Sequence, residues 1–238
     1  MYEFNDVLAE LKSLADAQKA KGQARFFKSG PGEYGEGDKF WGITVPQIRS
    51  VVKKYKDLPL KESEKLLQNE IHEVRLCAVL LLVQQYKNDP ENVYKIYSKN
   101  TKNLNNWDII DLSAEYIVGP YLEHKSKSQL TTFANSKSLW ERRIAMISTF
   151  YYIYHADDRE ALRIATILLY DKQDLIQKAV GWMLREVGKR CSEKDLEHFL
   201  DSYAHDMPRT TLRYAIERMS MEKKKHYMEM RTKEVVKL

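Results

Sequence analysis

The sequence predicts an all-α protein, built as an α-solenoid of antiparallel helical repeats. Apolar residues recur at spacings of three and four along almost the whole chain, which is the period of one helix face. No stretch of the 238 residues shows the alternation of apolar and polar side chains that marks a half-buried strand. Six of the nine glycines fall between Gly22 and Gly42, so few residues elsewhere interrupt a helix.

The predicted helices follow one another through short links, which favours antiparallel neighbours that stack in chain order. They cover residues 2–20, 46–56, 61–69, 72–87, 91–100, 107–118, 126–135, 139–154, 158–170, 174–189, 194–203, 208–219 and 221–232. Residues that favour helix starts precede several of them: Thr44 followed by Pro46, Asn105 and Asn106, Asp157 and Asp158, and Ser192.

A weak internal repeat supports the stacked arrangement. It places a basic residue beside small and aliphatic ones in Arg75-Leu76-Cys77-Ala78, Arg142-Arg143-Ile144-Ala145, Lys178-Ala179-Val180 and Arg213-Tyr214-Ala215. These starts are 67, 36 and 35 residues apart, so the first gap is about two periods. The pattern predicts one HEAT-like repeat domain over residues 1–238, although the usual HEAT or armadillo period is ~40–47. A compact irregular helical domain is the alternative.

Composition excludes a disordered chain, because 43% of the residues are hydrophobic and 11% are aromatic. The net charge is +5, and it is unevenly spread. Residues 1–120 carry 17 basic and 17 acidic side chains, whereas residues 121–238 carry 22 and 17. Ten of the 13 arginines lie in the second part. Because arginine suits bidentate phosphate contacts, this asymmetry indicates a polyanion-binding surface there, with an ordinary solvated helical surface as the alternative.

The two cysteines, the N-terminal residues and the lack of a long apolar run predict a soluble protein of a reducing cytosol. We expect it to be a monomer in a bacterial cytosol. Cys77 and Cys191 form neither a disulfide framework nor a metal-binding pair. The first six residues contain two acids and no basic residue, so the segment lacks the basic-then-apolar order of a signal peptide. The longest apolar run, residues 76–83, is too short for a bilayer span of about 20 residues.

The segment Gly30-Pro31-Gly32-Glu33-Tyr34-Gly35 matches a dinucleotide-binding pattern, but its context argues against that function. Such a site needs a strand before the glycines and a helix start after them, and here a helix precedes. Acidic residues at 33, 36 and 38 would also repel phosphate. A structured loop is the better interpretation.

The sequence indicates no metal or organic cofactor. It lacks the zinc-protease, G-x-S-x-G and phosphate-loop motifs, and its six histidines show no metal-ligand spacing.

Asp111 is unusual because it falls within an apolar helical stripe. On a helix over 107–118 the stripe contains Trp107, Ile110, Ala114, Ile117 and Val118, and Asp111 lies one turn after Trp107. A carboxylate there must be hydrogen-bonded, paired or facing a cleft. One interpretation is a structural aspartate that bonds to backbone amides of the next repeat, and the alternative is a carboxylate that faces a cleft.

The predicted helix 174–189 shows the converse anomaly. Its apolar stripe contains Ile176, Ala179, Val180, Met183 and Val187. Trp182 lies on the other face with three cations, Lys178, Arg185 and Lys189. An aromatic ring among cations is typical of a nucleic-acid surface, although a Trp covered by the next repeat fits equally well. Arg142 and Arg143 repeat the theme after Trp140.

These residues resemble the AlkD-like DNA alkylation repair family. The resemblance rests on residues 37–49 (GDKFWGITVPQIR) and, in the family's order, on Trp107-x-x-x-Asp111, Trp140-x-x-Arg143 and Gly181-Trp182-x-x-Arg185. It covers essentially the whole chain and implies a HEAT-like solenoid with a basic concave groove. One departure concerns Phe27, which lacks the hydroxyl expected of a tyrosine in some relatives.

The resemblance further implies a monofunctional DNA N-glycosylase that acts on N3- or N7-alkylated purines in double-stranded DNA without a cofactor. Trp107, Asp111 and Trp182 would form the catalytic cleft, and Arg143 and Arg185 would hold the DNA backbone, with Arg142, Lys178 and Lys189 as further DNA-binding candidates. A non-catalytic DNA-binding solenoid and a protein-interaction solenoid remain as alternatives.

Overall fold

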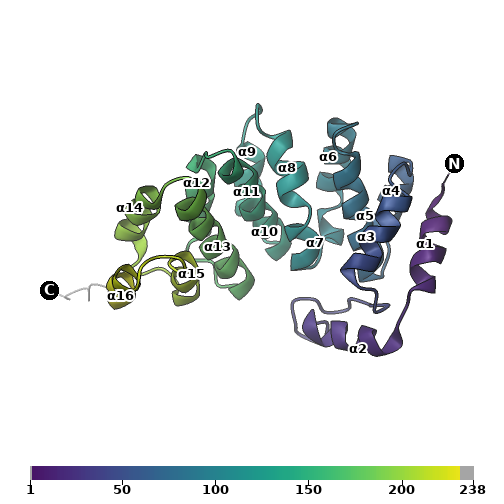
Figure 1. The fold of residues 1–238 in the computed structure, drawn as a ribbon, viewed down its shortest axis with the longest axis horizontal. Helices are drawn as coiled ribbons and strands as arrows, with labels where there is room; N and C mark the ends of the chain where they lie inside the picture. Colours follow the sequence, from purple (N-terminus) through teal and green to yellow (C-terminus); the bar gives the residue numbers. More distant parts are fainter. Residues whose placement is uncertain (1, 231–238) are drawn as a thin grey trace. The chain divides into compact units, whose positions relative to one another are not determined.

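The computed structural model describes residues 2–230, and its regular secondary structure is helical throughout that range (Figure 1). The described chain divides into two compact units at Tyr121 and Leu122. The only β-type pairing in residues 2–230 is an isolated bridge between Lys39 and Ile71. Within the same range, every helix is too short or too polar to pass through a membrane.

The first unit is organised around one buried helix, α5 (His72–Gln85). Twelve of its 14 residues are buried, so it is enclosed on all sides. Helices α3, α4, α6, α7 and α8 pack against it. The unit's other elements are α1 (Phe4–Ser13), α2 (Ala17–Phe26), α3 (Val45–Lys54), α4 (Leu60–Leu67), α6 (Pro90–Lys99), the 3-10 turn η1 (Thr101–Asn103), α7 (Trp107–Asp111) and α8 (Ala114–Tyr121).

The second unit is organised around a long amphipathic helix, α13 (Asp174–Arg190). Helices α10, α11, α12, α14 and α15 pack against it. Its other helices are α9 (Ser128–Ala134), α10 (Leu139–Ser148), α11 (Phe150–Tyr154), α12 (Arg159–Leu168), α14 (Glu193–Tyr203), α15 (Arg209–Ala215) and α16 (Met221–Glu229). The predicted last helix extended to residue 232, and residues 231 and 232 lie outside the described range.

Several predicted helix starts are confirmed by their capping bonds. Thr44 forms a reciprocal capping box with Gln47. The Asn106 side chain accepts a hydrogen bond from the Trp107 amide at 2.9 Å. Ser192 accepts one from the Asp195 amide at 3.1 Å. These side chains satisfy amides that the first turn of a helix leaves without a partner.

Three predicted helices, 2–20, 107–118 and 139–154, each divide in two, and short polar side chains explain the breaks. The Asp16 carboxylate accepts from the amides of Gln18 and Lys19 and starts α2. The Ser113 hydroxyl donates to the Ile109 carbonyl at 2.6 Å, and the Thr149 hydroxyl donates to the Met146 carbonyl at 2.7 Å. Such bonds compete with the backbone ladder and interrupt a helix.

The glycine-rich segment is a structured loop, as predicted. Helix α2 precedes it, which is the wrong context for a dinucleotide-binding turn. Gly42 has a φ of +82° and lies so close to α2 that a Cβ there would approach the Asp16 carbonyl oxygen to 2.0 Å. The Glu73 carboxylate accepts from the amides of Trp41, Gly42 and Ile43 at 2.7–3.1 Å. The loop is therefore tied to both α2 and α5.

Candidate functional site

Helix α7 carries two of the predicted catalytic residues, Trp107 and Asp111. They lie four residues apart and therefore project from the same side of the helix. Both are half-buried, whereas Ile110 and, in α8, Ile117 and Val118 are fully buried. Asp111 thus lies at the border of the apolar face. An acid in this position can reach a bound ligand and is still partly shielded from water.

The Trp107 ring belongs to an aromatic cluster contributed by α2 and the loop after it. Its centroid lies 5.9 Å from that of Phe26 and 5.5 Å from that of Phe27. Phe27 in turn stacks on Phe40 at 5.4 Å, with an interplanar angle of 6°. Phe27, the position where a tyrosine was expected, therefore contacts the predicted catalytic tryptophan directly.

Beneath these rings lies a group of buried charges that the sequence reasoning missed. His72 Nδ1–H donates to Asp38 at 2.9 Å, and Nε2–H donates to Asp108 at 2.9 Å. Arg75 donates to Asp38 and also, at 2.9 Å, to Asn105. The available signal was the presence of His72, Glu73 and Arg75 at the start of an apolar helix, where buried charges need partners.

The two carboxylates keep His72 protonated. Burial lowers the pKa of His72, but the hydrogen bonds to Asp108 and Asp38 and the charges of these two acids raise it to about 9. Burial also acts to raise the pKa of Asp38, but the hydrogen bond from His72 and the charge of Arg75 outweigh it, so this pKa lies below its usual value. The basic side chains of His72 and Arg75 thus lie directly against the carboxyl groups of Asp38 and Asp108.

In the second unit, α13 has the two faces that the sequence predicts. Ile176, Ala179, Val180, Met183 and Val187 are all buried. Lys178, Trp182, Arg185 and Lys189 are half-buried or exposed. The Trp182 ring contacts Phe150 edge-on with a centroid distance of 5.7 Å. Trp182 is thus partly covered by α11 and partly accessible.

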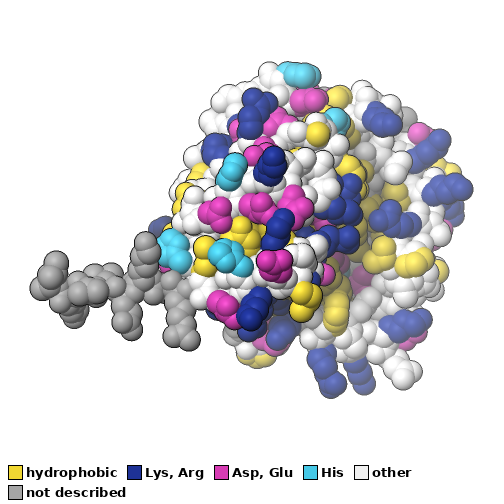
Figure 2. Space-filling model, turned by 60° about the vertical axis from the view of Figure 1, so that its left-hand side comes forward, with side chains coloured by type: hydrophobic (Ala, Val, Ile, Leu, Met, Phe, Trp, Pro, Cys, Tyr) yellow, Lys and Arg dark blue, Asp and Glu magenta, His cyan; other side chains and the backbone are white. Residues whose placement is uncertain are grey.

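Four of the five predicted DNA-binding cations of this unit form ion pairs with acids. Lys178 lies 2.6 Å from Asp174, Arg185 pairs with Glu217, and Lys189 lies 3.9 Å from Glu186. Arg142 donates through Nε to Asp171 at 2.6 Å. Figure 2 shows acidic side chains interspersed with lysine and arginine on the surface nearest the C-terminal end. A polyanion would have to compete with these acids.

Arg143 is buried, with 5% of its surface exposed, and donates to the Leu175 carbonyl at 2.6 Å. Arg75 makes a similar bond in the first unit, to Asn105. The bonds span 32 and 30 residues respectively, about one repeat. The basic residue of the weak internal repeat therefore ties one helical pair to the next at these two positions.

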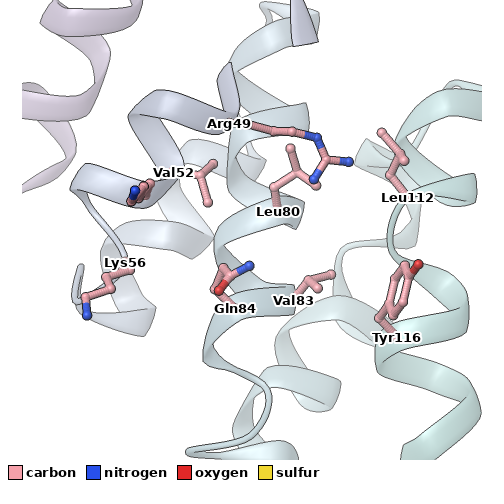
Figure 3. Close-up of a pocket in the computed structure, with 9 residues that line it drawn as sticks. Arg49, Val52, Lys56, Leu80, Val83, Gln84, Leu112 and Tyr116 are labelled. Atoms are coloured by element: carbon pink, nitrogen blue, oxygen red, sulfur yellow. The ribbon is translucent and has the colours of Figure 1, made fainter. Parts of the chain in front are cut away.

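The first unit contains a cavity of about 470 Å³ lined by α3, α5 and the segment from Leu112 to Tyr116 (Figure 3). Its apolar lining is formed by Val52, Leu80, Val83 and Leu112. Three exposed cations, Arg49, Lys53 and Lys56, lie around it, and the Arg49 guanidinium points over Leu80 toward Leu112.

No acidic residue lines this cavity, and no ion pair involves any of its three cations within the described chain. Counting charges along the sequence did not find this site, because the first 120 residues have no net charge.

The sequence matches the family model described as "DNA alkylation repair enzyme" over residues 7–219. A solved structure described as a predicted DNA alkylation repair enzyme from Enterococcus faecalis is similar, with a TM-score of 0.71 and 18% sequence identity. The alignment covers 87% of this chain and 97% of that one. The search of curated proteins finds no match.

The all-helical fold and the extent of the match define the class of protein. The chain belongs to the DNA alkylation repair enzyme family, and the resemblance inferred from its tryptophan motifs is confirmed.

Proposed function

We propose that this protein is a DNA glycosylase that hydrolyses the N-glycosidic bond of positively charged N3- or N7-alkylated purines in duplex DNA. The observation that carries the proposal is the pairing of Trp107 and Asp111 on one side of α7, both partly exposed, in a member of a DNA alkylation repair family. The catalytic set consists of these two residues together with Trp182.

The chemistry suits so small a set of residues. Alkylation at N3 or N7 places a positive charge on the purine, so the base leaves readily without a general acid. The sugar then develops oxocarbenium character, as in other glycoside hydrolyses. The Asp111 carboxylate can oppose this charge and orient the attacking water. The faces of Trp107 and Trp182 can contact the cationic sugar and exclude bulk solvent.

DNA binding in this proposal uses cations from both units. In the first unit, Arg49, Lys53 and Lys56 contact phosphates, since none of the acids in the described part of the chain pairs with them. In the second, Lys178, Arg185 and Lys189 exchange their acidic partners for phosphates, and Arg142 and Arg143 support the same surface. The predicted HEAT-like repeat domain over residues 1–238, with its basic groove, is part of this proposal.

The direct test is an assay for free base with a duplex that contains 7-methylguanine, under single-turnover conditions. The proposal predicts release of 7-methylguanine and an abasic site, with no release from the unmethylated duplex. Tight duplex binding without base release would instead identify a non-catalytic DNA-binding protein. A protein that neither binds the duplex nor releases the base would instead favour a protein-interaction function.

A further inference from the structure

The buried charge group of the first unit adjoins the proposed catalytic helix. Helix α7 has only five residues, too few to be stable without tertiary contacts. Its first turn is held by two carboxylate bonds of Asp108. Oδ1 accepts from the Ile109 amide at 2.9 Å, and Oδ2 accepts from His72 at 2.9 Å. The position of α7 therefore depends on a side chain of α5.

Holding Asp108 also fixes the rotation of α7 about its own axis. Successive helix residues are about 100° apart, so Asp108 projects to one side of the direction shared by Trp107 and Asp111. If Asp108 is fixed against α5, the side of α7 from which the Trp107 and Asp111 side chains project is fixed as well. Arg75 reinforces this by binding Asn105, two residues before α7 begins.

The same imidazolium supports the Trp107 ring from behind. Phe27 and Phe40 each lie 4.8 Å from the His72 ring, and Phe27 continues the contact to Trp107. A cation against aromatic faces is favourable, particularly when both are shielded from water. His72 thus contacts both groups that support α7: the carboxylate of Asp108, and the rings of Phe27 and Phe40 that pack behind Trp107.

The charged groups around His72 come from three elements. Asp38 approaches from the glycine-rich loop, Asp108 from α7, and Arg75 from α5 by way of Asp38. The neighbouring Glu73 is turned away, toward the amides of residues 41–43. His72 is the first residue of α5, where the helix dipole disfavours a positive charge. The two carboxylates must therefore account for its protonation.

We infer that His72, clamped between Asp38 and Asp108, is a positioning residue that orients Trp107 and Asp111 of α7 for base excision. This inference rests on the proposed function. Without the imidazolium, Asp108 is a buried carboxylate with no opposing charge, and α7 moves toward water to solvate it. The chemical step slows, while DNA affinity, which depends on surface cations, is retained.

The test compares His72→Gln with a control variant of another buried charged residue of the first unit, Glu62→Gln. Glu62 is 6% exposed, and its carboxylate accepts from the Phe4 amide and from Lys65, so it contacts neither α7 nor the loop that carries Asp38. We expect His72→Gln to lower the single-turnover rate of 7-methylguanine release at least tenfold, with DNA affinity within about twofold of wild type. The wild-type rate should decline above about pH 9, and this decline should be absent in His72→Gln. Glu62→Gln should retain the wild-type rate.

Hydrogen exchange supplies a readout that does not depend on activity. The amides of Ile110 and Leu112 donate to the carbonyls of Asn106 and Asp108. They should exchange at least tenfold faster in His72→Gln than in wild type, and at the wild-type rate in Glu62→Gln. Unchanged exchange in His72→Gln, or faster exchange with an unchanged excision rate, would overturn the inference. If the wild-type protein releases no base, the proposed function fails, whereas the exchange result still decides whether His72 holds α7.

Discussion

The two units place their charged residues in opposite ways. In the first unit, the cations around the cavity are exposed and form no ion pair with any acid of residues 2–230, while charges of both signs are buried and matched beneath α7. In the second unit, the cations of α13 lie at the surface and are paired with acids. The cations of α13, in the half of the chain with the excess of arginine, are therefore less available to a polyanion than those around the cavity. The net charge of a segment therefore predicts its affinity for a polyanion only when the cations that are already paired with acids are left out of the count.

The histidines show the same contrast. His72 is buried and protonated in the first unit, whereas the histidines of the second unit, at positions 124, 155, 198, 205 and 226, are exposed. Alkaline pH should therefore weaken the first unit selectively. The folded pKa of about 9 lies above the ordinary value of 6.5, so the contribution of His72 to stability is complete below pH 6.5 and is lost as the pH rises through 9.

The largest expected effect is on stability. The shift in pKa of His72 corresponds to about 3 kcal/mol of unfolding free energy, lost between pH 6.5 and 9.5. Urea unfolding at these two pH values measures it, with His72→Gln as the control that lacks the titrating group. Equal losses in wild type and His72→Gln would show that the buried cluster does not stabilise the first unit.

A somewhat smaller effect is expected on DNA affinity when the cavity loses its cations. The triple variant Arg49→Gln, Lys53→Gln and Lys56→Gln should bind duplex DNA about 10- to 100-fold more weakly at low salt. The slope of log K against log salt should decrease by about 2 to 3, because up to three phosphate contacts are lost. Binding titrations over a range of salt concentrations measure both quantities. An unaltered slope would remove the cavity from the DNA-binding surface.

The smallest effect is expected from Arg185→Ala in the second unit. Binding to all duplexes should weaken to a similar degree, and the salt slope should decrease by about 1 at most, because Glu217 already competes for this guanidinium. Glu217→Gln is the matched variant and should strengthen binding by releasing Arg185. If Arg185→Ala weakens binding more than the triple variant does, the contrast between the units is wrong.

Much of the fold follows from local sequence signals. The 3–4 periodicity predicted the helices, and capping residues such as Thr44, Asn106 and Ser192 marked their starts. The breaks at Ser113 and Thr149 were not predicted, because a Ser or Thr hydroxyl within an apolar run can either continue a helix or bond to its backbone. Tertiary packing decides between these two outcomes.

The sequence predicts only those parts of the candidate site whose residues lie close together along the chain. Trp107 and Asp111 share one side of α7 because of their spacing, which the sequence shows directly. The clamp on His72 combines Asp38, 34 residues earlier, with Asp108, 36 residues later. No periodicity links such distant positions. The same is true of ion pairs such as Arg185 with Glu217, which decide whether a cation is available to DNA.

The central claim is that the carboxylate on α7 performs the chemistry, and Asp111→Asn tests it most directly. Single-turnover release of 7-methylguanine should fall by at least about 100-fold, since the substitution removes the charge that opposes the oxocarbenium ion. Affinity for the same duplex should remain nearly unchanged, and Asp57→Asn, at an exposed acid of the same unit, should excise at the wild-type rate. Release by Asp111→Asn at the wild-type rate would contradict the claim.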